Sequence, residues 1–308
     1  AVNNANITAW DWDFGDGNSS NLQNPQHAYA SDGTYDVELT VTTDSNCTAI
    51  WQSTVTVYPK PDAIIGASDQ CLYDDINFDD LSDVNVPDNI TAWEWEFGDG
   101  NSSNVENPSN AYASEGIYDI ELMVETNNGC RDTATTQIEL FAVPSTGFEF
   151  DSVCAEATTT FTDTSSISTG TISGYEWDFA DGNSSTLQDP THIYTAPSVY
   201  NVELVSISDE GCRDSITQSV PVYPNPIADF DDVDACLNDS NIFTDQSSVV
   251  AGSIDEWAWD FDDGNTSTEQ NPNHAYGISG QYNVTLTVTT DRGCTADTTR
   301  QTEVHDLP

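Results

Sequence analysis

The chain has 308 residues, of which 53 are Asp or Glu and only five are Lys or Arg, so its formal net charge is −48. Nucleic acids and anionic membrane surfaces bind clustered basic side chains, so this composition argues against both as partners. Self-repulsion of this size opposes compact packing unless salt or bound divalent cations relieve it. No apolar run is long enough to span a bilayer, so we expect no direct membrane insertion in this segment.

A six-residue motif, W-[DE]-F-x-D-G, recurs four times, beginning at Trp12, Trp95, Trp177 and Trp259. The copies are 83, 82 and 82 residues apart, and a fixed period of this size indicates tandem copies of one small domain. We predict four repeats, and we expect the first to lack its opening strands because only 11 residues precede its Trp. The predicted domains are residues 1–59, 60–143, 144–224 and 225–308.

The second repeat shows the expected elements in chain order. Strands are predicted over residues 63–66, 76–78, 91–97, 118–124 and 133–140, with a tight glycine turn at 98–101. No segment has helical periodicity, so the pattern predicts an all-β sandwich. Trp93, Trp95 and Phe97 share one face of their strand and are predicted to lie in the core. Trp51 has no counterpart in the other repeats and is the better candidate for an exposed, sugar-binding aromatic.

The order of the motifs resembles that of the PKD (polycystic kidney disease) domain. Repeat 1 has WDFGDG, NPQHAY and GTYDVELTV, and repeat 4 has WDFDDG, NPNHAY and GQYNVTLTV. Repeat 3 departs at Ala180 and Val199, where the pattern has glycine. The resemblance implies tandem Ig-like (PKD-type) β-sandwiches in an elongated string, used outside the cell. The paired cysteines and acidic bias look like repeat proteins of bacterial surfaces, including gliding-motility adhesins exported by the type IX route.

From this resemblance we expect an extracellular structural or adhesive region that forms a rigid stalk or filament on a bacterial surface and is not an enzyme. Its partners would be neighbouring repeats of the same long chain, other copies in a filament, or surface glycans. PKD-like modules also accompany secreted proteases and chitinases. The alternative is therefore a spacer or carbohydrate-binding accessory region of a secreted polysaccharide- or protein-degrading enzyme.

The seven cysteines alternate between two positions in the repeat, which indicates disulfides in an oxidising compartment. In an Ig-like sandwich the two positions lie at opposite poles, too far apart for a bond within one repeat. If repeats join head to tail, one pole meets the opposite pole of the next repeat. This predicts inter-domain bridges Cys71–Cys212 and Cys154–Cys294. The intra-domain alternative, which stays open, is Cys71–Cys130, Cys154–Cys212 and Cys236–Cys294.

Two sets of polar residues recur in the repeats: one predicts a structural turn, and the other is a candidate calcium site. The charge excess raises the possibility of calcium, which some PKD-like domains bind between their second and third strands. The turn aspartates Asp16, Asp99, Asp181 and Asp263 fit Asx-type turns better than a metal site. His27, His192 and His274 recur, but Asn110 takes their place in repeat 2, so we expect hydrogen-bonded corner residues. The matching calcium candidates are Asp79, Asp80, Ser82, Asp83, Asp163, Ser165, Asp245 and Ser247.

A short D-[ST]-x pattern resembles the O-glycan acceptor of gliding-type bacteria. It occurs at Asp132-Thr133-Ala134, Asp214-Ser215-Ile216 and Asp297-Thr298-Thr299, which we place at the same point of three repeats. We therefore expect Thr133, Ser215 and Thr298 as candidate glycosylation sites.

Overall fold

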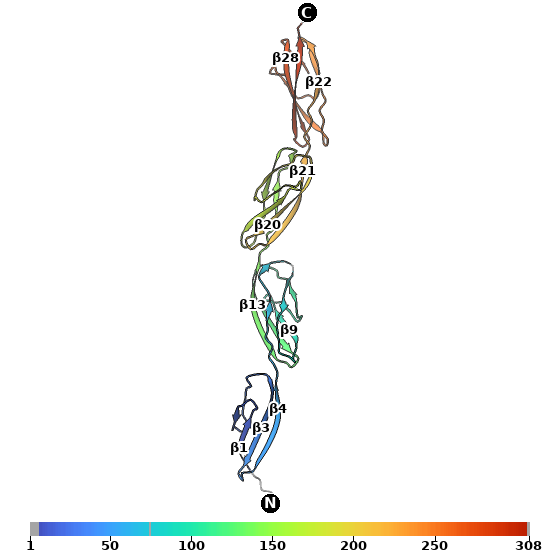
Figure 1. Ribbon diagram of the computed structural model, residues 1–308. Helices are drawn as coiled ribbons and strands as arrows, with labels where there is room; N and C mark the ends of the chain where they lie inside the picture. The colour runs from blue at the N-terminus through green and yellow to red at the C-terminus, as the bar shows by residue number, and fades with distance from the viewer. Residues whose placement is uncertain (1–5, 74, 307–308) are drawn as a thin grey trace. The chain divides into compact units, whose positions relative to one another are not determined.

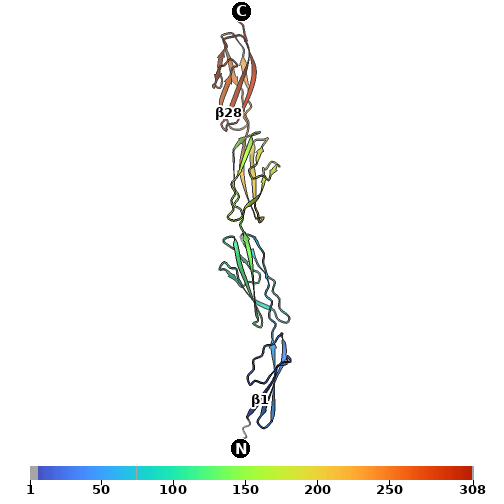
Figure 2. The same cartoon turned by 90° about the vertical axis from the view of Figure 1, so that its left-hand side faces the viewer.

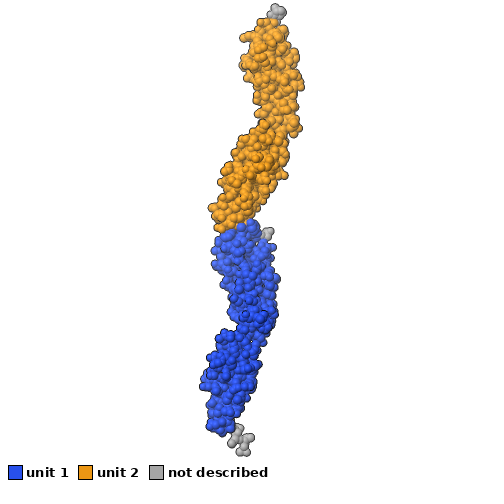
Figure 3. Space-filling model, viewed as in Figure 1, with its two compact units in different colours: residues 1–142 blue, residues 143–308 orange. Residues whose placement is uncertain are grey.

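The computed structural model describes residues 6–73 and 75–306, and these residues form strands, turns and irregular segments (Figure 1). The chain divides into two compact units (Figure 3). Unit 1, residues 1–142, contains repeats 1 and 2, and unit 2, residues 143–308, contains repeats 3 and 4. Over the described ranges, no helix is long and apolar enough to cross a membrane. The prediction of an all-β, Ig-like fold is confirmed.

In unit 2, repeat 3 folds as two facing sheets. The smaller sheet has the order β14-β16-β19 and the larger has the order β15-β21-β20-β17-β18. All pairings are antiparallel except that of β15 with the end of β21. The strands are β14 (Phe148–Phe150), β15 (Val153–Cys154), β16 (Thr158–Asp163), β17 (Ile172–Asp178), β18 (Ser184–Ser185), β19 (Thr191–Ile193), β20 (Ser198–Ser208) and β21 (Arg213–Tyr223).

Repeat 4 has the same plan, with sheets β22-β24-β27 and β23-β29-β28-β25-β26. Figure 1 labels β28 of the larger sheet and β22 of the smaller sheet, and Figure 2 shows β28 after a turn of 90°. The strands are β22 (Phe230–Val233), β23 (Ala235–Cys236), β24 (Ser240–Asp245), β25 (Ile254–Asp260), β26 (Thr266–Ser267), β27 (Asn273–Ala275), β28 (Gly280–Thr290) and β29 (Thr295–His305).

In unit 1, repeat 2 has one five-stranded sheet, β10-β9-β12-β13-β6, and two small pairs, β11-β7 and β5-β8. The predicted strands are present with shifted ends, and the two-residue strands β6, β8, β10 and β11 were not predicted. The strands are β5 (Ile65–Gly66), β6 (Gln70–Cys71), β7 (Ile76–Asn77), β8 (Asp79–Asp80), β9 (Ile90–Glu96), β10 (Ser102–Ser103), β11 (Ser109–Asn110), β12 (Gly116–Thr126) and β13 (Arg131–Phe141).

The predicted aromatic face forms the core of each complete sandwich. Trp177 and Phe179 are buried against Phe161 of the facing sheet, with ring centroids 5.4 and 5.3 Å away. Repeat 4 repeats this arrangement with Trp259, Phe261 and Phe243. Because alternate residues of a strand point to opposite faces, the Trp-x-Phe spacing places both rings on the same side. These clusters confirm the prediction that the recurring aromatics are core residues.

Repeat 1 forms a single four-stranded sheet, β2-β1-β3-β4, from β1 (Ile7–Asp13), β2 (Ser19–Ser20), β3 (Gly33–Thr43) and β4 (Thr48–Val57). Trp51 pairs with Leu39, and the corresponding partner of Leu204 in repeat 3 is Ile216, which packs against the core. Trp51 therefore lies on the core side of its sheet. It is 55% exposed because no second layer covers that side among residues 6–58. Its exposure does not require a sugar-binding role.

The two tryptophans give a matched test of this packing. Trp259→Ala removes a ring that is 1% exposed and is expected to destabilise repeat 4 by about 3–5 kcal/mol, since a buried aromatic leaves a cavity. Trp51→Ala is expected to cost less than about 1 kcal/mol in repeat 1. Hydrogen exchange resolved by peptide measures both changes in one chain. Equal losses in the two repeats would contradict the assignment of a covered and an open face.

Candidate functional site: the seam between repeats 3 and 4

The recurring aspartates are structural turn residues, as predicted. Asp181 Oδ1 accepts a hydrogen bond from the Asn183 backbone at 3.0 Å, and Asp263 and Asn265 do the same at 3.0 Å. The ring Nε2 of His192 lies 2.7 Å from the second carboxylate oxygen of Asp181. Asn110 donates to Asp99 Oδ2 at 2.8 Å in repeat 2, so an amide substitutes for the imidazole. The recurring histidines are therefore corner residues, as the sequence indicated.

The hydrogen bonds at this turn control the charge of the aspartates. Burial acts to raise the pKa of Asp263, but hydrogen bonds from Asn265 and His274 outweigh it and hold the pKa below 3.8. The same balance lowers the pKa of Asp181, and it lowers that of Asp16 to about 2. All three carboxylates therefore remain ionised at neutral pH and accept hydrogen bonds at the turn.

Six of the eight calcium candidates lie in hydrogen-bonded turns in the structure. The carboxylate of Asp245 accepts bonds from the Ser247 backbone at 2.9 Å and from the Trp257 indole at 2.8 Å. The hydroxyl of Ser247 accepts a bond from the Asp229 backbone. Asp80 with Ser82 and Asp163 with Ser165 repeat the turn. No group of three or more acidic, His or Cys side chains among the described residues is arranged to hold a metal ion. Calcium at these positions stays a prediction.

The glycosylation candidates do not occupy one structural position. Thr133 lies opposite Met123 and Ser215 opposite Val205, and both are exposed. Thr298 instead lies opposite Leu286, a buried core residue, so its motif is shifted by one residue and its side chain points to the other face. The expectation of one shared position was therefore wrong. Glycosylation of the exposed Thr133 and Ser215 stays a prediction.

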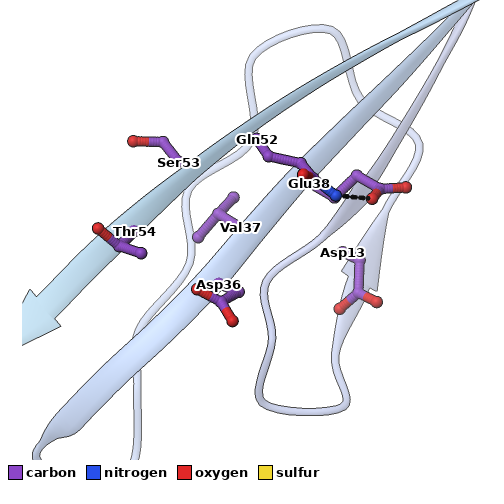
Figure 4. Close-up of a pocket in the computed structure, with 7 residues that line it drawn as sticks. All are labelled: Asp13, Asp36, Val37, Glu38, Gln52, Ser53 and Thr54. Atoms are coloured by element: carbon purple, nitrogen blue, oxygen red, sulfur yellow. Dashed lines mark hydrogen bonds between the residues drawn. The ribbon is translucent and has the colours of Figure 1, made fainter.

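A surface depression on repeat 1 is open and acidic (Figure 4). It measures about 440 Å³ and is lined by carboxylates from β1 and β3 and by polar side chains of β4, with Gln52 donating to Glu38 at 2.7 Å. The side chains of Asp13 and Asp36 also face it. A shallow surface of like charge offers neither an apolar wall nor a basic group to a ligand, so it makes a poor small-molecule site.

The seam between repeats 3 and 4 joins them covalently. We define it as Cys154, Ala155, the linker Tyr223–Pro226, Arg292 and Cys294. Cys154, on the short strand β15, and Cys294, after the β28–β29 hairpin, form a disulfide with a Cα–Cα distance of 5.6 Å. The fully buried Cys294 thus ties the last hairpin of repeat 4 to the end of repeat 3.

Polar and aromatic contacts surround the disulfide. The Ala155 amide donates to the Tyr223 carbonyl at 2.8 Å, which anchors the cysteine strand to the end of β21. The Asn225 side chain donates to the Ala155 carbonyl at 2.8 Å, so the linker is bonded back to repeat 3. The Arg292 guanidinium lies 5.3 Å from the centre of the Tyr223 ring, in the range of a cation–π contact. Sequence analysis missed the partners of Asn225 and Arg292.

Unit 1 contains the corresponding seam without a disulfide. The sulfur of Cys130, in the hairpin of repeat 2, lies 4.0 Å from the carbonyl oxygen of Tyr58 at the end of repeat 1. Lys60 of the linker forms an ion pair with Asp132, and Asp132 also accepts the Ala63 amide at 3.0 Å. Pro59 and Pro61 are buried. Both units therefore pack a proline linker beside a cysteine hairpin.

The disulfide decides between most of the predicted pairings. It agrees with the inter-domain scheme and excludes the alternatives Cys154–Cys212 and Cys236–Cys294, since each would use a cysteine already bonded. Cys130 is a free thiol, so Cys71–Cys130 is not formed. The predicted Cys71–Cys212 bridge would join the two units and stays a prediction. Among the described residues, Cys47 and Cys236 are also free thiols.

A family model of the PKD domain matches residues 2–58, 56–140, 142–222 and 223–305. The chain belongs to the PKD domain family. Four tandem copies therefore account for nearly all of its length, in agreement with the predicted number of repeats. The family assignment confirms the resemblance drawn from the motifs.

Two bacterial proteins are similar in sequence to parts of this PKD array. Collagenase ColA of Clostridium perfringens is 33% identical over 87 residues, and a pre-pro-metalloprotease PrtV of Vibrio cholerae is 48% identical over 62 residues. These alignments cover 28% and 20% of this chain but only 8% and 7% of those proteins. The PKD1 domain of Vibrio anguillarum Epp is 38% identical, with a TM-score of 0.26, over 27% of this chain and 96% of that domain. Similarity to gliding-motility adhesins stays a prediction.

The lowered aspartate pKa values predict a pH dependence. A carboxylate whose pKa is depressed on folding stabilises the fold above its unfolded value, near 3.8, and that contribution is lost as the pH falls through the folded value. Asp263→Asn is expected to destabilise repeat 4 at pH 7 by about 1 kcal/mol or less, because the site is partly exposed to solvent. The difference from wild type should shrink below pH 4 in denaturant titrations. A constant difference down to pH 2 would contradict the assignment.

The seam disulfide can be tested separately from the repeat cores. Cys294→Ser is expected to raise hydrogen exchange at the Thr290–Cys294 hairpin and at Asn225, while the amides of β20 and β25 keep their protection. Loss of the disulfide is expected to lower the free energy of unfolding by roughly 2–4 kcal/mol, because the bond no longer restricts the unfolded chain. Cys236→Ser, which removes a free thiol, is the matched control and should change neither region. Unchanged exchange at the hairpin in Cys294→Ser would mean that the disulfide does not hold the seam.

Proposed function

We propose that this chain is a non-catalytic extracellular spacer, an accessory array of PKD repeats in a secreted protein-degrading enzyme. The observation that carries the proposal is the covalent seam between repeats 3 and 4, where a disulfide and a packed proline linker restrict movement between neighbouring domains. Disulfides persist in oxidising compartments, which supports an extracellular location. The similarity to parts of a collagenase and a metalloprotease supports the link to protein degradation.

The use of the recurring polar residues also supports a structural role. The aspartates, histidines and serines that repeat along the chain are engaged in turn hydrogen bonds, as at Asp181, His192 and Ser165. All five basic residues form ion pairs with carboxylates. These contacts stabilise turns and strands, so the recurring residues serve the fold of each repeat.

The second candidate is a stalk or filament that carries an adhesive region on a bacterial surface. The same seam favours this candidate, because a disulfide between neighbouring domains restricts their relative movement, and a stalk needs that restriction to keep its ends apart. Its partners would be further repeats or surface glycans. The two candidates differ in what else the parent gene encodes: a protease catalytic domain favours the accessory spacer, and a long series of PKD repeats favours the stalk.

Direct binding measurements test whether the array only spaces or also binds. We expect no saturable binding of the oxidised chain to fibrillar collagen or to chitin in co-sedimentation at concentrations up to about 100 µM, a range that detects even weak recognition. Trp51→Ala removes the exposed tryptophan that is the candidate for sugar binding, and it should leave the sedimented fraction unchanged. Saturable binding that Trp51→Ala abolishes would replace the spacer proposal with a binding module.

A further inference from the structure

The last hairpin of repeat 2 contains an Asn–Gly pair. Asn128 is followed by Gly129, and no other asparagine in the sequence is followed by glycine. Both residues are exposed, and Gly129 takes a positive φ of 80° in the turn Thr126–Cys130. Because glycine has no Cβ, its backbone nitrogen can approach the asparagine side chain that precedes it with little steric hindrance. An Asn–Gly pair is for this reason especially prone to deamidation through a cyclic imide.

A buried carboxylate lies behind this turn. Asp88 is only 4% exposed, and its Oδ1 accepts a hydrogen bond from the side-chain amide of Asn128 at 2.8 Å. Its Oδ2 is buried and has no hydrogen-bond partner among residues 6–73 and 75–306. A buried carboxylate with an unpaired oxygen is costly, and the hydrogen bond from Asn128 offsets part of that cost. The environment of Asp88 therefore depends on an amide at position 128.

Two more hydrogen bonds connect the turn to the loop that carries Asp88. The Asn127 amide donates to the Asn89 carbonyl at 3.0 Å, and the Asn89 amide donates back to Oδ1 of Asn127 at 3.0 Å. The turn ends at Cys130, whose sulfur lies 4.0 Å from the carbonyl oxygen of Tyr58 at the end of repeat 1. The contacts of this turn thus couple the loop to the seam between repeats 1 and 2.

Repeat 3 shows which part of this arrangement is particular to repeat 2. The Asp209 amide donates to the Thr171 carbonyl at 2.9 Å, and the Thr171 amide donates back to Oδ1 of Asp209 at 3.2 Å. In this register Glu210 takes the place of Asn128, and Gly170 takes the place of the buried aspartate. An acidic side chain is thus accommodated at this turn where the facing residue has no carboxylate. Repeat 2 has the opposite combination, an amide that faces a buried acid.

We propose that Asn128–Gly129 is a deamidation site, and that its conversion to an acid releases the turn Thr126–Cys130 from the loop behind it. The product places a second carboxylate where Asp88 had its hydrogen-bond donor, so two like charges face each other at a partly buried contact. The modification is irreversible, and it loosens the seam between repeats 1 and 2 as the protein ages. This inference does not depend on the proposed enzyme association.

The reaction needs only water as a co-reactant. The backbone nitrogen of Gly129 attacks the side-chain carbonyl carbon of Asn128 and loses its proton, a succinimide ring closes, and the side-chain nitrogen leaves as ammonia. Water then opens the ring at either carbonyl. One opening gives aspartate, and the other gives isoaspartate, in which the main chain runs through the former side chain. In total one amide and one water become one carboxylate and one ammonium ion, and nothing is oxidised or reduced.

The folded turn slows the first step of this reaction. The Gly129 amide donates to the Thr126 carbonyl at 2.9 Å, and the nitrogen that has to leave Asn128 is held by Asp88. Attack therefore requires local opening of the turn, and the rate follows the population of the open form. Asp88 protects the site before deamidation and repels the product afterwards, so the release is delayed and then permanent.

Storage of the purified, oxidised chain in a warm, mildly alkaline buffer tests the site. We expect peptide mass spectrometry to find aspartate and isoaspartate mainly at Asn128, with much less conversion at the exposed Asn–Ser pair Asn183–Ser184. Asn128→Gln keeps an amide donor but closes an imide ring far more slowly, so this variant should stay unmodified at position 128. Conversion mainly at other asparagines would overturn the proposed site.

Hydrogen exchange tests the coupling to Asp88. In Asn128→Asp, exchange at the Asn89 amide should accelerate at least ~tenfold, a factor that corresponds to about 1.4 kcal/mol. The amides of β12 and of Thr171 in repeat 3 should keep their protection, which separates local release from unfolding. Asp88→Asn combined with Asn128→Asp should restore protection at Asn89, because the new amide donates to the new carboxylate.

Three results would overturn the coupling. The first is unchanged exchange at Asn89 in Asn128→Asp. The second is a loss of protection that extends through β12, because the whole repeat would then unfold and the release would not be local. The third is a double variant, Asp88→Asn with Asn128→Asp, that exchanges as fast as Asn128→Asp alone.

Discussion

The burial of one tryptophan and one phenylalanine beneath a ring of the facing sheet fixes the structure of each complete repeat. Trp177 and Phe179 lie two residues apart on β17, and both contact Phe161 across the sandwich. A slip of one residue would turn both rings to solvent, so this packing sets the register of the strand. The His192 ring stacks on Phe179 at 4.3 Å and reaches the carboxylate of Asp181, which extends the aromatic layer into the polar turn. The hydrogen-bonded turn is thus positioned by the core.

The same register places a cysteine at each pole of the repeat, and the seam follows from that placement. β15 adds to the edge of the large sheet by only two residues, yet it positions Cys154 beside the end of β21. The hairpin of repeat 4 then needs only its Cys294 at the turn to complete the bond. Surface ion pairs contribute little by comparison, typically up to 1 kcal/mol each, and the chain has only five basic residues to form them. A covalent bond holds neighbouring domains together where electrostatics favours separation.

The sequence predicted the features that repeat and missed those that depend on how two repeats meet. The period, the main strands and the aromatic core follow from the spacing of residues such as Trp259 and Phe261. The head-to-tail cysteine argument anticipated the Cys154–Cys294 bond. The partners of Asn225 and Arg292 could not be found, because they depend on the position of a linker relative to a hairpin. The motif search misplaced Thr298 because it matched letters without regard to strand register. Trp51 shares the face of its core-side neighbours, and the sheet order shows that no second layer covers it among residues 6–58, in line with the expected loss of the opening strands.

The disulfide between Cys154 and Cys294 also changes what happens when unit 2 is pulled from its two ends. It connects positions 140 residues apart, so mechanical load passes through the sulfur atoms and bypasses everything between them. The bypassed segment includes most of both cores and would otherwise lengthen by roughly 460–500 Å if it were stretched. Only the short stretches outside the two cysteines carry the load. Even a molecule whose sandwiches had come apart would therefore keep nearly its original reach, and its extensibility would be set by the redox state of one bond.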